Sequence, residues 1–279
     1  MKRKSILSIL LTGALAISLV GCGGSKTDNS TGSASSEEKT ITIGVTPVPH
    51  KDIVEAIKPE LEGKGYKVNI VEFTDYVTPN TSLEEGELDA NYFQTIAYLD
   101  ETNEGKGLHL TYTKGVHLEP LAVYSRKIKA IKEIQDGATV AVPNDPSNEA
   151  RALRVLENSG LIKLKDGELV TPKDIIENPK NLKFEELEAA QLPRVLDEVA
   201  IAVINGNYAL EAGLSPAKDA VFVEDANSEA SKKYHNVIAI KKGNENTQKI
   251  KDLTEALTSD TVKKYIEEKY SDGSVLPVF

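Results

Sequence analysis

The most suggestive chemistry in the sequence centres on Arg151, within the stretch of residues 138–156. A guanidinium in the first turn of a helix lies beside backbone amides, which carry partial positive charge and favour anions. Its planar fork can bind a carboxylate or phosphate through two parallel hydrogen bonds. Because cations are disfavoured at helix N-termini, the position of Arg151 favours an anion site. The alternative is that Arg151 is solvated or pairs with Glu149 or Glu188.

The residues around Arg151 predict a strand, a tight turn and a helix. Thr139–Val142 is a short apolar, β-branched run that predicts a buried strand. The turn Asn144-Asp145-Pro146 combines side chains that bond their own backbone with a fixed φ angle. Ser147 or Asp145 then supplies an N-cap, and Glu149–Leu156 has helical periodicity without a breaker. A buried strand therefore leads to a helix whose first amides are available.

The four histidines are the other residues with obvious chemical potential: His50, His109, His117 and His235. They could in principle form a metal site, but none shows ligand spacing such as H-x-x-x-H, so we expect structural or solvated histidines and no metal. The motifs of serine hydrolases, P-loop nucleotide binders and zinc proteases do not occur in the sequence. We therefore expect a binding protein, not an enzyme, and no cofactor.

The first residues predict export and lipid attachment. Lys2-Arg3-Lys4 precedes an apolar run, Ile6–Val20, which is shorter than the roughly 18–20 residues that span a bilayer. Leu19-Val20-Gly21-Cys22 resembles the bacterial lipobox, in which the cysteine becomes the lipidated first residue. Cys22 is the only cysteine of the 279 residues, so an internal disulfide is excluded. The alternative is ordinary cleavage near Gly21, which leaves a free thiol.

The composition after the signal argues against a nucleic-acid partner. Ser25–Lys39 is rich in Ser, Thr and Gly and predicts a flexible tether. Removal of residues 1–21 would change the formal net charge from −10 to −13. No basic cluster remains, which excludes the usual electrostatic footprint of nucleic-acid binding and adhesion to anionic lipid. We expect contact with the membrane through a lipid on Cys22, on the extracytoplasmic side of the cell membrane.

From Thr40 onward, strands and helices alternate in two runs, which predicts two α/β lobes with parallel sheets wrapped by helices. We expect Tyr92–Thr102 to be helical and Gly160–Asn181 to be irregular with one helical turn. The chain would cross between the lobes near Leu118–Ser125 and Tyr234–Lys242, and a ligand would lie in the cleft between them. The predicted division is 1–21 as signal peptide, 22–39 as tether, 40–120 with 239–279 as lobe I, and 121–238 as lobe II.

Several stretches that together cover almost all of Thr40–Phe279 carry a resemblance to a known family. The stretches are Val71–Asn80, Leu88–Gln94, Val140–Asn148, Gly160–Gly167, Ile176–Lys183, Glu188–Arg194, Ala202–Asn205 and Pro216–Asp225. In these stretches the chain is similar to the substrate-binding lipoproteins of bacterial ABC importers, and within these to the NlpA/MetQ group, which is known for methionine. The resemblance implies a doubly wound, two-lobed fold of the type II periplasmic-binding-protein class.

The family's ligand-binding residues match six positions of this chain, which the resemblance implies as binding residues: Tyr76, Phe93, Tyr98, Arg151, Asn205 and Asn236. The aromatic residues would form an apolar wall, while Arg151 and the two Asn side chains would hold the carboxylate and ammonium groups of an amino acid. Packing in the core is the alternative for each aromatic residue, and an N-cap for Asn205.

Three further positions are candidate ligand contacts: Thr95, Asn148 and Glu119. Thr95 stands where many family members have His, which removes a large polar wall. Glu119 could face an ammonium group or lie on the hinge surface. The resemblance implies capture of L- or D-methionine and its delivery to the permease and ATPase subunits of an importer. The alternatives are another small apolar amino acid or a methionine-containing dipeptide and, with less support, a metal-binding lipoprotein or an enzyme that alters its ligand.

Overall fold

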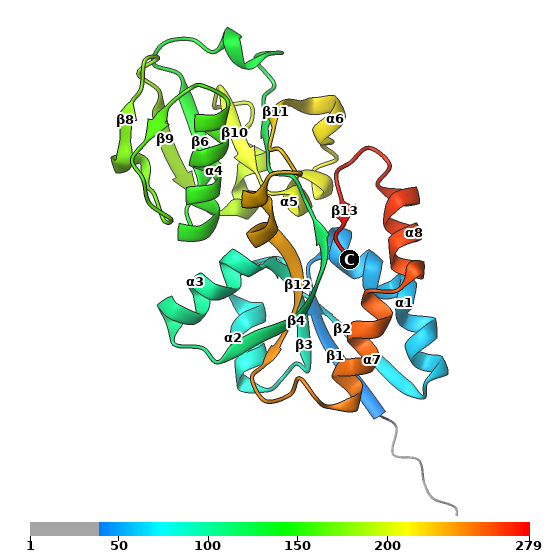
Figure 1. Cartoon of the computed structure of the whole chain (residues 1–279). Helices are drawn as coiled ribbons and strands as arrows, with labels where there is room; N and C mark the ends of the chain where they lie inside the picture. Colours follow the sequence, from blue (N-terminus) through cyan, green and yellow to red (C-terminus); the bar gives the residue numbers. More distant parts are fainter. Residues whose placement is uncertain (1–38) are drawn as a thin grey trace, which may run out of the picture. The chain divides into compact units, whose positions relative to one another are not determined.

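The computed structural model describes residues 39–279, and the predictions on the signal peptide, on Cys22 and on the tether up to residue 38 concern residues outside this range. Two larger sheets and a two-stranded sheet form the framework, with helices packed against them (Figure 1). Within the described range, no helix combines the length and the apolar composition that a membrane crossing needs.

The first sheet has six strands in the order β13-β4-β12-β3-β1-β2. Its strands are β1 (Lys39–Val45), β2 (Tyr66–Glu72), β3 (Ala90–Thr95), β4 (Leu110–Leu118), β12 (His235–Lys241) and β13 (Leu276–Pro277). The helices of this half are α1 (Asp52–Gly63), α2 (Thr78–Glu85), α3 (Ile96–Lys106), α7 (Gln248–Leu257) and α8 (Asp260–Lys269), and the short turn η1 (Pro47–Lys51) follows β1.

Alternation along β12 explains why helices cover both faces of this sheet. Ile238 and Ile240 pack in one core cluster with residues of α1, α7 and α8. Val237 and Ala239, one position along, pack in another cluster with Leu83 of α2 and with Leu99 of α3. Successive side chains of a strand point to opposite faces, so an uninterrupted apolar strand requires cover on both.

The second sheet has five strands in the order β11-β5-β10-β6-β9. They are β5 (Ala122–Tyr124), β6 (Thr139–Pro143), β9 (Lys183–Leu187), β10 (Ile201–Ile204) and β11 (Ala220–Val223). Around them lie η2 (Ile131–Glu133), α4 (Pro146–Asn158), η3 (Pro172–Asp174), η4 (Ala189–Val195), α5 (Gly206–Glu211), α6 (Pro216–Asp219) and η5 (Glu229–Tyr234). In β6, Val140 and Val142 pack in one cluster with Leu153 of α4, and Ala141 packs in another with Leu192 of η4.

The chain passes from the first sheet to the second after β4 and returns at β12, so the six-stranded sheet contains segments from both ends of the described chain (Figure 1). This arrangement confirms the predicted two-lobed α/β fold class. The residue limits assigned to the lobes stay a prediction, although β12 already begins at His235, four residues before the expected start of the second segment of lobe I.

The local structure corrects three expectations. The sheets are mixed, because β12 runs antiparallel to β3 and β4, and β5 antiparallel to β10. The expected helix at Tyr92–Thr102 is wrong over its first four residues: β3 continues to Thr95, and α3 begins at Ile96. β3 is buried over five of its six residues, and such a run without alternation does not distinguish strand from helix. Gly160–Asn181 is not irregular throughout, since β7 (Lys163–Leu164) and β8 (Ile175–Glu177) pair within it.

Candidate functional site

The sequence-predicted ligand residues all line one hollow of about 360 Å³, part of which is open to solvent. They come from both halves of the structure: Tyr76, Phe93, Thr95, Tyr98 and Asn236 from the half with the six-stranded sheet, Glu119 from the crossing after β4, and Asn148, Arg151 and Asn205 from the half with the five-stranded sheet. Gln94, Gly206 and Asn207 complete the lining.

An aromatic cluster forms one wall of the hollow. The ring of Tyr76 lies 5.8 Å from that of Phe93 and 5.7 Å from that of Tyr98, measured between centroids. The Tyr98 hydroxyl donates to the Tyr76 carbonyl at 2.9 Å, which fixes the loop before α2 against α3. Tyr208, which the sequence did not single out, also contacts Tyr76, with ring centroids 5.0 Å apart and the planes tilted by 34°. The wall is therefore built of aromatic rings packed on one another.

A relay of hydrogen bonds fixes the orientation of two side-chain amides. Asp145 is the N-cap of α4 and accepts from the backbone N–H of Asn148 at 2.9 Å. It also accepts from Asn148 Nδ2 at 2.9 Å. Since an ionised carboxylate only accepts, Asn148 Oδ1 must face the other way, where it accepts from Asn205 Nδ2 at 2.7 Å. Asn205 Oδ1 is buried and has no partner among the described residues, so it offers a free acceptor at the hollow.

The side-chain amide of Asn207 is oriented the opposite way to that of Asn205, with its oxygen hydrogen-bonded and its nitrogen left over. Its Oδ1 accepts from the Tyr76 hydroxyl, and its Nδ2 is buried with no short hydrogen bond in the described part of the chain, its nearest polar group being the Glu211 carboxylate. Buried polar groups are usually hydrogen-bonded, and an unpaired one costs about 1–3 kcal/mol. Asn205 thus presents an unpaired acceptor and Asn207 a weakly engaged donor, two residues apart. Sequence reasoning missed Asn207, although its place just after a buried strand resembles that of Asn205.

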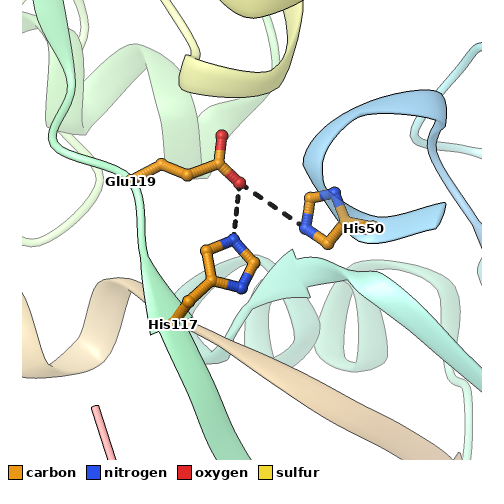
Figure 2. A group of neighbouring side chains, drawn as sticks. All are labelled: His50, His117 and Glu119. Carbon is orange, nitrogen blue, oxygen red and sulfur yellow. Dashed lines mark hydrogen bonds and ion pairs between the residues drawn. The ribbon is translucent and has the colours of Figure 1, made fainter. Parts of the chain in front are cut away.

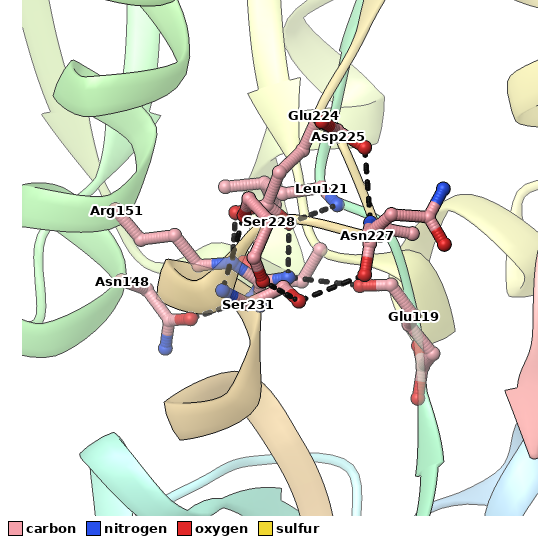
Figure 3. A network of polar contacts seen from close by, with 11 residues as sticks. Glu119, Leu121, Asn148, Arg151, Glu224, Asp225, Asn227, Ser228 and Ser231 are labelled. Carbon is pink, nitrogen blue, oxygen red and sulfur yellow. Dashed lines mark hydrogen bonds and ion pairs between the residues drawn. The ribbon is translucent and has the colours of Figure 1, made fainter. Parts of the chain in front are cut away.

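Arg151 is buried and already has partners (Figure 3). Its Nε donates to Glu224 Oε1 at 3.1 Å, and its Nη2 donates to Glu224 Oε2 at 2.6 Å and to the Glu119 carbonyl at 2.9 Å. Its guanidinium carbon lies 4.2 Å from the centre of the Tyr234 ring. The ion-pair alternative considered from the sequence is therefore the one found, but the partner is Glu224 and neither Glu149 nor Glu188. Its Nη1 donates to no residue of the described range, and Arg151 lines the hollow.

Two histidines meet Glu119, which lines the hollow, and the sequence spacing did not predict this cluster (Figure 2). Both are buried and hydrogen-bonded, in keeping with the expectation of structural or solvated histidines. His117 Nε2 lies 2.8 Å from Glu119 Oε1, and His50 Nε2 lies 3.5 Å from the same oxygen. The sequence could not indicate this, since His50 follows β1 and His117 lies in β4. His109 instead contacts Glu84 at the surface.

The opposite nitrogens of both imidazoles are also occupied. His50 Nδ1 lies 2.7 Å from Thr46 Oγ1, and His117 Nδ1 is hydrogen-bonded to the Tyr92 hydroxyl. Burial lowers the pKa of His50 to about 4 and that of His117 to about 3, so both are neutral at pH 7. Burial also raises the pKa of Glu119, against the effect of His50 and Arg151. Two imidazoles and a carboxylate are donors that a transition metal accepts, but here hydrogen bonds within the protein already satisfy them.

Two α/β lobes around a hollow with an aromatic wall and several polar side chains define a two-lobed substrate-binding protein, similar to the periplasmic binding proteins. The chain belongs to the NlpA lipoprotein family, whose sequence model matches residues 41–279. This is a family of substrate-binding lipoproteins of ABC transporters and not of enzymes.

Relatives and solved structures agree with this assignment. The D-methionine-binding lipoprotein MetQ of Escherichia coli (strain K12) is 43% identical over 270 residues, which cover 95% of this chain and 94% of that protein. A nutrient binding protein from Burkholderia cenocepacia bound to methionine is 42% identical, with a TM-score of 0.81, and the match covers 86% of this chain and 100% of that one. Lipoprotein Tp32 from Treponema pallidum is 38% identical, with a TM-score of 0.83 and coverage of 87% and 100%.

Proposed function

We propose that the chain is the extracytoplasmic substrate-binding lipoprotein of an ABC importer and that it captures methionine in the hollow. The observation that carries the proposal is the division of the lining into an aromatic wall and a polar end with unused hydrogen-bonding atoms. An α-amino acid with an apolar side chain has the same division. The relatives named for methionine support this choice of side chain.

The two ends of methionine would be bound by different chemistry. The thioether would lie against Tyr76, Phe93 and Tyr98, where a sulfur–aromatic contact contributes about 0.3–1.5 kcal/mol. The α-carboxylate would accept from Arg151 Nη1 and from the amide nitrogens of Asn207 and Asn236. Asn236 is suited to this because its Oδ1 is engaged by His50 Nε2 at 3.1 Å, which turns its Nδ2 away from the imidazole.

Transport would require the protein to remain at the membrane and to deliver its ligand. Membership of a lipoprotein family supports a lipid anchor on Cys22 at the outer side of the cell membrane. The bound amino acid would then pass to the permease, driven by the ATPase subunits of the importer. Neither step needs a cofactor or a nucleic-acid partner.

The identity of the ligand can be tested by denaturing the purified protein and analysing released small molecules by mass spectrometry. We expect unmodified methionine. Melting temperatures measured with L-methionine, D-methionine, leucine and a methionine-containing dipeptide then rank the candidates, since saturation at a hundred times the dissociation constant stabilises the fold by about 2.7 kcal/mol. A shift with Zn²⁺ that chelator reverses, or a chemically altered amino acid, would replace the proposal by a metal-binding or an enzymatic function.

A further inference from the structure

We propose that Glu119, clamped by His50 and His117, is the subsite for the ligand's α-ammonium and restricts the hollow to compounds with a free, protonated amino group. The inference rests on the proposed function, because it assigns one part of the hollow that binds the amino acid. It adds the chemical class that the site accepts and a positioning role for two histidines that no comparison assigns.

The geometry places a carboxylate at the polar end of the hollow. Glu119 lines the hollow, yet only 6% of its surface is exposed. The Nε2 atoms of both histidines approach the same oxygen, Glu119 Oε1. Its Oε2 lies against Gly206, where a Cβ atom would come within 2.4 Å of that oxygen. The absence of a side chain at Gly206, another residue of the lining, leaves the space that the carboxylate fills.

Among the described residues, no Lys or Arg side chain is paired with the Glu119 carboxyl group. His50 and His117 are neutral at pH 7, so their N–H groups orient the carboxylate without neutralising it. Arg151 reaches the backbone carbonyl of Glu119, but its guanidinium is paired with the carboxylate of Glu224. A buried carboxylate without a cation is costly, and a ligand that supplies an ammonium group removes that cost.

His50 also couples the ammonium subsite to the carboxylate subsite. His50 Nε2 lies 3.5 Å from Glu119 Oε1 and 3.1 Å from Asn236 Oδ1. One imidazole therefore orients both an acceptor for the ammonium group and an amide whose nitrogen is free for the carboxylate. Asn205 Oδ1, buried and unpaired, offers the ammonium a second acceptor. Adjacent acceptors and donors match the α-amino acid, whose two charged groups are attached to the same carbon.

The first test compares ligands on the wild-type protein by calorimetric titration. L-Methionine should bind roughly 30- to several-thousand-fold more tightly than 4-(methylthio)butanoate, which lacks the amino group, or than N-acetylmethionine, in which it is neutral. Equal affinity for methionine and the des-amino acid would overturn the inference while leaving the proposed function intact. Failure of the wild type to bind methionine at all would instead overturn the proposed function.

The second test removes the charge and keeps the shape. Glu119→Gln should bind methionine roughly 30- to several-thousand-fold more weakly than the wild type does. Its affinity for 4-(methylthio)butanoate should be unchanged or higher. Glu157→Gln, a change outside the hollow in which the carboxylate pairs with Arg154, is the matched control and should bind like the wild type. His117→Gln should weaken methionine binding less than Glu119→Gln, because it loosens the carboxylate without removing it.

Two outcomes of these titrations would assign the cluster differently. A folded Glu119→Gln variant that binds methionine within threefold of the wild type would show that the ammonium group is held elsewhere. Saturable binding of Zn²⁺ to the wild type that is lost in His117→Gln would make the cluster a metal site and overturn the inference. If Glu119→Gln fails to fold by circular dichroism, the ligand comparison on the wild type still decides.

Discussion

At the scale of the residue, Arg151 serves the fold as well as the site. It is 4% exposed, and both of its paired nitrogens face Glu224. Breaking a buried ion pair by removing one partner costs about 3–5 kcal/mol, because the other charge remains buried. We therefore expect Arg151→Met to lower the free energy of unfolding in urea by that amount, as well as to weaken methionine binding.

The double variant Arg151→Met/Glu224→Met is the control for this prediction. It removes both charges together, so it should be more stable than Arg151→Met alone while still binding methionine poorly. A single variant with the urea midpoint of the wild type would show that the pair contributes little to stability.

Glu149 makes a second residue-scale prediction, which concerns pH. It is 6% exposed, and its Oε1 has no partner within residues 39–279. Burial, with Glu186 and Asp145 nearby, raises the pKa of Glu149 from 4.5 to about 7. A raised carboxyl pKa means that stability is fully present below about pH 4.5 and is lost as the pH rises through about 7. Glu149→Gln should therefore raise the free energy of unfolding at pH 8 by on the order of 1–3 kcal/mol and change it little at pH 4.

Urea unfolding of Glu149→Gln at the two pH values checks this. Glu157→Gln is a useful comparison, because the pKa of Glu157 is lowered by the Leu164 backbone N–H and Arg154 in spite of its partial burial. Glu157→Gln removes this stabilised negative charge and should therefore lower the free energy of unfolding at neutral pH. Equal effects of Glu149→Gln at pH 4 and pH 8 would contradict the prediction.

At the scale of the element, the strand, turn and helix around Arg151 were predictable because their signals are local. Thr139–Val142 lies within β6, and the choice between Asp145 and Ser147 as N-cap is decided for Asp145. Because α4 therefore begins at Pro146, Arg151 lies in its second turn, and the expectation that it lies in the first turn is wrong. The pairing of Arg151 with Glu224, 73 positions apart, and the meeting of His50 with His117 were not predictable from spacing. Such contacts depend on how the sheets bring distant segments together, and the mixed strand directions were missed for the same reason.

The N-cap of α4 leads to an element-scale prediction, because Asp145 both caps the helix and orients Asn148 and Asn205. Asp145→Ala should lower the free energy of unfolding by about 1 kcal/mol, the usual effect of losing a cap. It should also weaken methionine binding, since the two amides lose their fixed orientation. Asp145→Asn keeps the cap but can present either amide atom to Asn148, so it should restore stability more fully than affinity. Calorimetry and urea unfolding on both variants measure the two effects; unchanged methionine affinity in Asp145→Ala would contradict the role of the relay.

At the scale of the whole molecule, the proposed role requires attachment to a membrane outside the cytoplasm. Cys22→Ala should remove the site of lipidation, because no other cysteine can replace it. We expect the variant to remain unprocessed or to appear in the soluble exported fraction, as judged by membrane fractionation and labelling with a fatty-acid analogue. A variant that still carries lipid and stays in the membrane would contradict the assignment of Cys22.

The central claim is that the hollow between the two sheets captures methionine without changing it. Calorimetric titration of the protein, stripped of ligand by unfolding and refolding, tests this most directly. We predict saturable binding of one equivalent of methionine, lost when Arg151 is replaced by Met and kept in Glu157→Gln. The account would be contradicted by a refolded protein that shows no saturable binding of L- or D-methionine but is saturated by another amino acid, a dipeptide or Zn²⁺.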